Sequence, residues 1–237
     1  MPDLYHFWSS FESQRVRLAL SCKGIEWADH ALRYDDDQTF FDLGTARHVP
    51  QLVLDSGERL DHSERILWEA DRHFPQGESL VAGRIDAAAW HALTEWRRRV
   101  DTILDRLYAP LRPAYRDIAA DADTMAAYKA GVANKYGLSL EALANDRYAG
   151  YQQLARLSRL TQLARHLSQN RFYTGAISIA DLLLTADLFP LQQVRLFGRG
   201  QANIDSLSEL ARSRGLEPCV VPVPLKRCKE QTWSSPR

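Results

Sequence analysis

The hydrophobic pattern of this 237-residue chain changes near residues 76–84, and this change limits the folds that the chain can adopt. Before this point, short apolar segments alternate with turn residues, which is typical of strands joined to short helices. After it, apolar residues recur at steps of three and four, which is typical of amphipathic helices. We therefore expect an α+β fold with a β-α-β-β-β-α domain over residues 1–76 and an all-helical domain over residues 84–215. Residues 216–237 carry four prolines without periodicity and predict an extended tail.

The first domain has a recognisable order of elements. Gly24 follows an amphipathic run as a helix-ending glycine does, and Pro75 stops the last helical pattern. The turn Asp55-Ser56-Gly57 lies between two apolar segments and predicts a hairpin. We expect strands within 4–8, 26–34, 51–54 and 58–60, helices within 14–23 and 63–74, and a partly helical segment at 35–48.

The second domain reads as helices only. The pattern Trp96, Val100, Ile103 and Leu107 predicts one long helix over 84–108, which Pro110 and Pro113 interrupt. Ser178 and Asp181 form the Ser-x-x-Asp pattern of a capping box and predict a helix start. Further helical patterns cover 122–136, 139–167 and 178–197.

Composition excludes several classes of protein. Thirty basic and thirty acidic residues give a net charge of zero, which argues against nucleic acid as the main partner. No apolar run reaches the roughly 18 residues of a membrane span, and no signal peptide is expected. The three cysteines, Cys22, Cys219 and Cys228, form neither a CxxC motif nor a metal-ligand spacing. We expect reduced thiols, a cytoplasmic location and no metal.

Small hydroxyl side chains mark the boundary between the first strand and the first helix. Ser9, Ser10 and Ser13 follow the apolar run LYHFW and precede an arginine-containing helical pattern. Serine is a preferred helix N-cap, so capping is one interpretation. A helix N-terminus also attracts anions, so a hydroxyl placed there can instead hold a thiolate or a phosphate.

Three patterns in this order resemble the cytosolic glutathione transferases, over roughly residues 3–200. The segment SSFESQRVRLAL is similar to the zeta and omega classes, in which a serine or cysteine stands five residues before the arginine. The segment HVPQLVLDSGERLDHSERIL is similar to the family's Val-Pro strand, turn and helix start. The segment YTGAISIADLLL resembles the family's capping box in the helical domain.

The resemblance implies a thioredoxin-like first domain and a glutathione site. Ser10 would donate a hydrogen bond to the thiol of glutathione, although Ser9 is adjacent and can substitute for it. The Val49-Pro50 bond would be cis, with the Val49 backbone facing the cysteinyl unit, and Ser63 would cap the next helix. The residues around glutathione would be Phe11, Val49, Pro50, His62 and Ser63.

One position departs from the family pattern. The family places an acid or amide before the serine of the helix start, to accept from the γ-glutamyl ammonium of glutathione, and this chain has His62. A neutral imidazole accepts a hydrogen bond but carries no negative charge. We expect reduced or pH-dependent glutathione affinity, which Asp61 or a second subunit can compensate. Arg15 and Arg17 can bind the glycyl carboxylate or face solvent, and solvent is the preferred expectation.

Two functions follow from the resemblance. One is a homodimeric glutathione transferase, whose bound glutathione attacks a small hydrophobic co-substrate. Tyr108 and Trp233 are candidates for its apolar pocket, although core packing or disorder is the preferred expectation for each. The other is a non-catalytic binding protein similar to the stringent starvation proteins, which the segment ADRHFP also resembles. A dithiol oxidoreductase is disfavoured because no CxxC is present.

Overall fold

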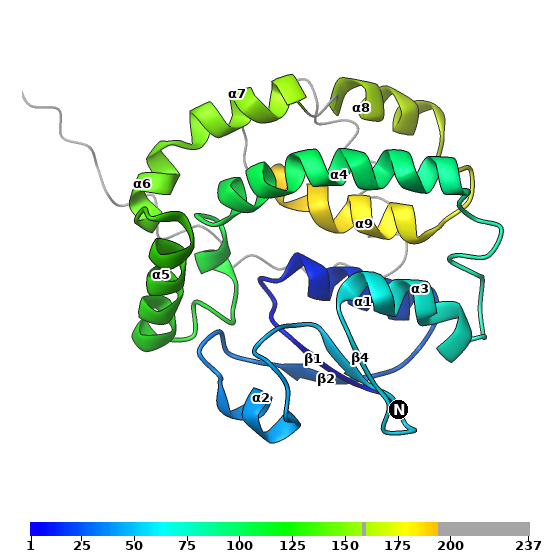
Figure 1. Cartoon of the computed structure of the whole chain (residues 1–237), viewed down its shortest axis with the longest axis horizontal. Helices are drawn as coiled ribbons and strands as arrows, with labels where there is room; N and C mark the ends of the chain where they lie inside the picture. Colours follow the sequence, from blue (N-terminus) through cyan, green and yellow to red (C-terminus); the bar gives the residue numbers. More distant parts are fainter. Residues whose placement is uncertain (158–159, 194–237) are drawn as a thin grey trace, which may run out of the picture.

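The computed structural model describes residues 1–157 and 160–193. In this part of the chain a four-stranded sheet with two covering helices is followed by helices (Figure 1). The elements of the first part are β1 Asp3–His6, α1 Phe11–Cys22, β2 Ala28–Ala31, α2 Gln38–Leu43, β3 Gln51–Val53, β4 Arg59–Asp61 and α3 Ser63–His73. Those of the second are α4 Ala87–Tyr108, η1 Arg112–Ala114, α5 Ala122–Tyr136, α6 Leu140–Asn145, α7 Arg147–Leu157, α8 Leu160–Gln169, α9 Ile179–Leu188 and η2 Phe189–Gln193.

The sheet has the order β2-β1-β3-β4. β1 pairs in parallel with β2 and antiparallel with β3, and β4 returns antiparallel to β3. The register aligns Leu4, Leu52 and Leu60 in one row across three strands, and each is at most 1% exposed. Because alternate strand residues face the same side, this row gives the sheet one apolar face, which α1 and α3 cover.

The predicted α+β class and the thioredoxin-like order of four strands are confirmed. The structure adds the short helix α2 between β2 and β3, within the segment expected to be partly helical. Phe40 of α2 is buried and packs edge-on against Phe7. This aromatic contact holds α2 beside the loop that leads from β1 to α1.

The helices form successive layers above α1 and α3, with α9 and α4 next and α7 and α8 beyond them (Figure 1). Every residue of α9 is buried, since it lies between α1 and α4. The predicted capping box is present: the Ser178 hydroxyl accepts from a backbone N–H, and Asp181 accepts from the Ser178 N–H at 2.9 Å. Two buried N–H groups at the start of α9 are thereby satisfied.

The helical pattern over 139–167 is divided in the structure. α6 ends at Asn145, where Asp146 takes the C-cap position, and α7 begins at Arg147. Asparagine and aspartate favour such ends because their short side chains compete with helical hydrogen bonds. Gly150 in α7 faces α4, where a Cβ atom would lie 2.7 Å from Leu107 Cδ2, so glycine permits this close packing.

Candidate functional site

A cleft of about 540 Å³ opens between the sheet layer and the helical layer. One wall comes from the start of α1, the loop before β3 and the start of α3. The other wall comes from α4, the segment after it, α5 and the end of α9. We call these the sheet wall (Phe7, Ser9, Ser10, Phe11, Glu12, Arg15, Tyr34, His48, Val49 and His62) and the helical wall (Asp101, Leu104, Asp105, Tyr108, Arg112, Tyr128, Lys135 and Asp187).

Ser10 both caps α1 and lines the cleft. Its backbone is extended, with φ −88° and ψ 117°, and its hydroxyl oxygen accepts from the Ser13 N–H at 3.2 Å. Within residues 1–157 and 160–193 this hydroxyl donates to no other group, so its proton can be given to a ligand. The two interpretations of the serine, a helix cap and a donor to an anion, are therefore compatible in one side chain.

Ser9 is engaged elsewhere. Its side chain donates to Asp117 Oδ2 at 2.5 Å, and its backbone N–H lies 3.1 and 3.2 Å from the two carboxylate oxygens. Both residues are buried, Ser9 at 4% and Asp117 at 3% exposure. Burial raises the pKa of Asp117, against the hydrogen bonds from Ser9 that favour the charged form. Ser9 thus joins the strand end to the helical region, and its proton is already used.

The loop before β3 places Val49 at the cleft. The Val49-Pro50 peptide bond is cis, as the resemblance implied. Val49 lines the cleft, whereas Pro50 is buried behind it. Phe11 also lines the cleft and packs edge-on against Tyr108, with ring centroids 5.0 Å apart.

The predicted solvent exposure of Arg15 and Arg17 is wrong, since each is only 6% exposed. Arg15 Nη2 lies 2.6 Å from Asp187 Oδ1, and Arg15 Nη1 donates to Ser63 Oγ at 3.1 Å. Arg97 of α4 donates to Asp187 Oδ2 at 2.8 Å. Asp187 therefore holds two arginines from different layers and fixes the sheet wall to the helical wall.

Arg17 is held on the other side of α1. It lies 2.5 Å from Asp29 Oδ1 and stacks over the ring of Trp8 at 4.3 Å. His6 Nε2 lies 2.9 Å from the same guanidinium, and burial followed by the charge of Arg17 lowers the pKa of His6. This group does not line the cleft and stabilises the packing of α1 on the sheet.

The start of α3 differs from the prediction in one respect. Ser63 is the first helical residue and not the cap, and its buried hydroxyl accepts from Arg15. The cap position belongs to His62, whose side chain makes no capping hydrogen bond. His62 has φ 59°, and it is the one non-glycine residue with positive φ within residues 1–157 and 160–193. Such a backbone is uncommon outside glycine and is found preferentially at functional sites.

The helical wall contributes aromatic groups and an ion-pair network. Tyr108 is 1% exposed and donates to the Asp187 carbonyl at 2.8 Å, and burial raises its pKa well above the usual value. Although burial opposes it, the charge of Arg112 and a hydrogen bond from Lys135 lower the pKa of Asp105 to about 2. Arg112 and Lys135 lie 2.6 and 2.5 Å from the two Asp105 oxygens.

Of the predicted site residues, four line the cleft together: Ser10, Phe11, Val49 and His62. Pro50 and Ser63 lie behind the sheet wall. Pro50 is bonded to Val49, and the Ser63 hydroxyl accepts a hydrogen bond from Arg15. Trp233, Cys219 and Cys228 fall outside the described residues. Cys22 is half-buried against the core shared by α1 and the helical layer.

The comparisons with known proteins agree with this geometry. Residues 4–78 match the family of the glutathione S-transferase N-terminal domain. This match spans the sheet, α1 and α3, and therefore the whole sheet wall of the cleft. A search of curated proteins found no match.

Solved structures extend the likeness to the helical region. Glutaredoxin 2 from Salmonella typhimurium, in complex with glutathione, has a TM-score of 0.69 and 17% identity, covering 93% of this chain and 99% of that one. A Ceriporiopsis subvermispora glutathione S-transferase in complex with glutathione has a TM-score of 0.68 and 15% identity, covering 93% and 98%. A glutathione S-transferase from Rhodospirillum rubrum F11 has a TM-score of 0.62 and 17% identity, covering 94% of this chain and 95% of that one. At these identities the likeness establishes the fold.

Sequence reasoning missed the partners of the site. Asp117 holds Ser9 across 108 positions, and Asp187 holds Arg15 across 172. Asp187 stands within the predicted apolar helix SIADLLLTADLF, and an acid among such residues signals a buried partner.

Within the described helices, none is both long enough and apolar enough to span a membrane.

Proposed function

We propose that this protein is a glutathione transferase that binds glutathione along the sheet wall and activates its thiol with Ser10. The observation that carries the proposal is the Ser10 hydroxyl, which caps α1, faces the cleft and keeps its proton available. The family match over residues 4–78 supports glutathione as the ligand, as do the structural neighbours that hold glutathione. The subclass we favour is zeta- or omega-like, from the serine five residues before Arg15.

The chemistry required of Ser10 is modest. The thiol of glutathione has an ordinary pKa near ~8.5, so only a small fraction is thiolate at neutral pH. A reduction of about two pKa units needs about 2.7 kcal/mol of preferential binding of the thiolate. A hydrogen bond to a charged sulfur and the positive end of α1 together supply an energy of this size. Ser10 remains a neutral donor throughout.

The rest of the sheet wall provides positions for the tripeptide. Backbone groups of Val49, in the loop that precedes β3, can pair with the cysteinyl unit as an added strand does. The γ-glutamyl end would lie toward His62 and the first N–H groups of α3, where a carboxylate is favoured. Phe11 would lie beside the sulfur, between Ser10 and Tyr108.

The helical wall would hold the electrophile. Leu104, Tyr108 and Tyr128 face the cleft, and the polar atoms of both tyrosines donate to backbone carbonyls of the protein. A small hydrophobic co-substrate would find aromatic carbon there, beside the ion pairs of Asp105 with Arg112 and Lys135. None of the described residues lining the cleft is a cysteine, so attack by bound glutathione is favoured over exchange through a protein thiol.

The remaining expectations belong to the same proposal. The chain would divide into domains at 1–76 and 84–215, act as a homodimer and work in the cytoplasm. Glutathione would be a co-substrate, consumed when its sulfur bonds to the electrophile.

A second candidate is a non-catalytic binding protein of the same fold. It is favoured by the start of α3, where His62 offers no negative charge to an ammonium group and the Ser63 hydroxyl is already bound by Arg15. His62 and Ser63, two of the residues expected around glutathione, are therefore altered in chemistry or already engaged. Weak or absent glutathione binding would follow.

The test measures binding, thiolate formation and turnover in one set of proteins. Calorimetric titration gives the affinity for glutathione, the ultraviolet absorbance of the thiolate gives its pKa, and a generic aromatic electrophile gives turnover. We expect Ser10→Ala to raise the thiol pKa by about one unit, because the positive end of α1 remains, and to lower turnover by up to about tenfold at neutral pH.

Ser139→Ala is the matched control. Ser139 is also an N-cap serine, accepting from the Ala142 N–H at 3.1 Å, but it caps α6 away from the cleft. The Ser139→Ala variant should lose a similar capping energy without changing the pKa of the glutathione thiol. If wild-type protein fails to bind glutathione at neutral and slightly alkaline pH, the second candidate replaces the first.

A further inference from the structure

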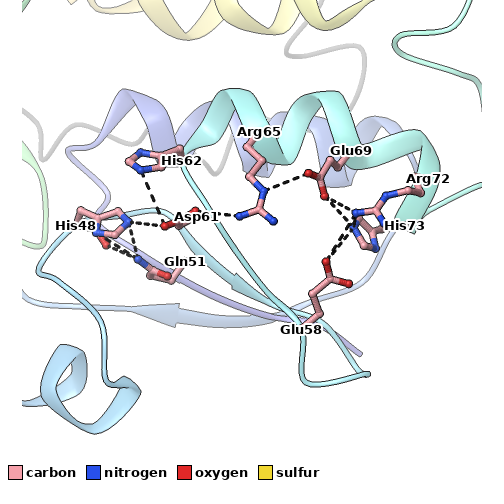
Figure 2. Close-up of polar contacts among 9 residues, drawn as sticks. All are labelled: His48, Gln51, Glu58, Asp61, His62, Arg65, Glu69, Arg72 and His73. Atoms are coloured by element: carbon pink, nitrogen blue, oxygen red, sulfur yellow. Dashed lines mark hydrogen bonds and ion pairs between the residues drawn. The ribbon is translucent and has the colours of Figure 1, made fainter.

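Three side chains of metal-ligating type meet at the mouth of the cleft. His48 comes from the loop before β3, Asp61 from the end of β4 and His62 from the cap position of α3 (Figure 2). The histidine rings stack with centroids 5.0 Å apart and an angle of 18° between their planes. His48 and His62 both line the cleft, and their side chains and that of Asp61 are 31%, 71% and 38% exposed.

The separations suit ligands around one ion. His48 Nε2 lies 3.6 Å and His62 Nε2 3.9 Å from Asp61 Oδ2, and the three ligand atoms all lie within 4.8 Å of one another. These distances are too long for hydrogen bonds. A tetrahedral zinc ion with bonds of about 2.0–2.1 Å holds its ligands about 3.3 Å apart. The three atoms are thus close enough to share one ion, and turning one of the stacked rings out of the stack would direct both imidazole lone pairs at it.

The neighbouring groups leave the site usable. Arg65 Nη1 lies 3.4 Å from Asp61 Oδ1, which leaves Oδ2 directed to the histidines. Gln51 Nε2 lies 2.8 Å from His48 Nε2 and 3.3 Å from the His48 carbonyl. When His48 binds a metal, this amide can keep the carbonyl as its acceptor. The carbonyl contact would then hold Gln51 close to the ring as an outer-sphere group.

A second cluster with similar composition differs in charge. Glu58, Glu69 and His73 also converge, but Arg72 and Arg65 lie 2.6 and 3.1 Å from the Glu69 oxygens (Figure 2). Hydrogen bonds from these two arginines lower the pKa of Glu69 to about 2. Arg72, which is also 3.7 Å from Glu58, thus takes the place that a cation would need, and this cluster is an ion-pair network.

We propose that His48, Asp61 and His62 form a binding site for a divalent transition metal ion, with zinc as its probe. Two imidazoles and one carboxylate are the ligands of borderline metals and not of calcium or magnesium, which prefer oxygen alone. With three protein ligands, at least one coordination position remains for water or for a ligand in the cleft. The site does not depend on the proposed transferase chemistry, and it would make the cleft mouth a cationic anchor for carboxylates.

The sequence indicated no metal because the ligands come from separate segments. His48 and His62 are 14 positions apart, and they meet only because the β3–β4 hairpin returns the chain to its starting edge. No short motif contains them. The adjacent pair Asp61-His62 reads in sequence as a turn before a helix.

The experiment is a titration of chelator-treated full-length protein with zinc by calorimetry, without glutathione, which itself binds zinc. A parallel titration with cobalt follows the visible absorption of the bound ion. We expect one site in wild-type protein and about tenfold or greater weakening in His48→Ala, His62→Ala and Asp61→Asn. Asp61→Asn is nearly isosteric, and thermal unfolding of each variant checks that the fold is kept.

Two further variants serve as controls. His91→Ala removes an exposed histidine of α4 and should leave the zinc affinity unchanged. His73→Gln tests the second cluster and should also leave it unchanged. The proposal is overturned if wild-type protein binds no zinc, if the affinity survives loss of both His48 and His62, or if it follows His73 instead. Since the titration contains no glutathione, its failure leaves the transferase proposal untouched.

Discussion

The two walls of the cleft use polar side chains in opposite ways. On the helical wall, Asp105 is held by Arg112 and Lys135, and both tyrosine hydroxyls donate to backbone carbonyls. On the sheet wall, the Ser10 hydroxyl donates to no group in the described part of the chain, and the His62 side chain makes no capping hydrogen bond. These helical-wall groups are paired within the protein, whereas Ser10 and His62 of the sheet wall, unlike Ser9 and Arg15, present groups that a ligand can satisfy.

This difference distinguishes polar groups that can bind a ligand from those that stabilise the fold. A buried polar group that is already paired gains little from a ligand, while an unpaired group at a cleft gains a hydrogen bond. This is why the proposed function gives glutathione the sheet wall and the co-substrate the helical wall. Asp187 joins the two walls through Arg15 and Arg97, in addition to the Ser9–Asp117 and Arg97–Glu64 contacts.

The strongest way to break this arrangement is Asp187→Ala. The substitution leaves Arg15 and Arg97, 7% and 11% exposed, without their shared counter-charge. We expect a loss of about 3–5 kcal/mol in the free energy of unfolding, measured by urea denaturation. Asp101→Ala removes an exposed acid from the same wall and should change stability by less than about 0.5 kcal/mol. Equal effects would show that Asp187 does not join the walls.

Lowering the pH tests the ion pairs that Asp105 makes on the helical wall. Asp105 has a pKa of about 2 in the folded protein against an ordinary 3.8, so it stabilises the fold above pH 3.8. That stability, about 2 kcal/mol, is lost as pH falls through the folded pKa. Asp105→Asn should be less stable than wild type at neutral pH, and the gap in unfolding free energy should close toward pH 2. A constant gap would contradict the ion-pair network.

Ser9 and Ser10 sharpen the comparison because they are adjacent but have different roles. Ser9 binds the buried Asp117, and Ser10 faces the cleft. Ser9→Ala removes one donor from the buried Asp117 carboxylate and should lower stability by about 1–2 kcal/mol. Its effect on the pKa of bound glutathione should be small, whereas Ser10→Ala should shift that pKa strongly. Chemical denaturation and thiolate absorbance measure the two effects. The assignment fails if Ser9→Ala moves the thiol pKa more than Ser10→Ala.

The smallest effect is expected at His62. The substitution His62→Gln would supply an amide acceptor for an ammonium group without depending on the tautomer of an imidazole. We expect glutathione to bind about 0.5–1 kcal/mol more tightly, measured by calorimetry with a chelator present to remove metal ions. The exposed His91→Ala should bind glutathione as wild type does. A weaker affinity in His62→Gln would indicate that the imidazole itself contacts the ligand.

Much of the fold was predictable from local patterns. The leucine positions in three strands, the Asp55-Ser56-Gly57 turn and the Ser178-Asp181 capping box each act within a few residues. The helix break at Asp146 was missed because amphipathic periodicity continues through it. α2 was anticipated only in part, since its six residues are too few for a clear periodic signal.

The candidate site was predictable only where one segment carries it. Ser10 could be placed at a helix start from spacing, but its neighbour's bond to Asp117 could not, and this bond distinguishes the two hydroxyls. Arg15 was expected in solvent because helical periodicity alone cannot reveal that a second helical layer covers that side. His48 and His62 gave no signal because neither is part of a local motif.

Local sequence specified which segments become strands and helices, where several of them start, and that a hydroxyl would stand at the first helix cap. Tertiary packing decided which hydroxyl keeps its proton, which arginines are buried and which histidines meet. The reason is that caps, turns and periodic faces depend on neighbours along the chain. Ion pairs such as Arg15–Asp187 instead join positions 172 residues apart, and only the packing of α1 against α9 brings them together.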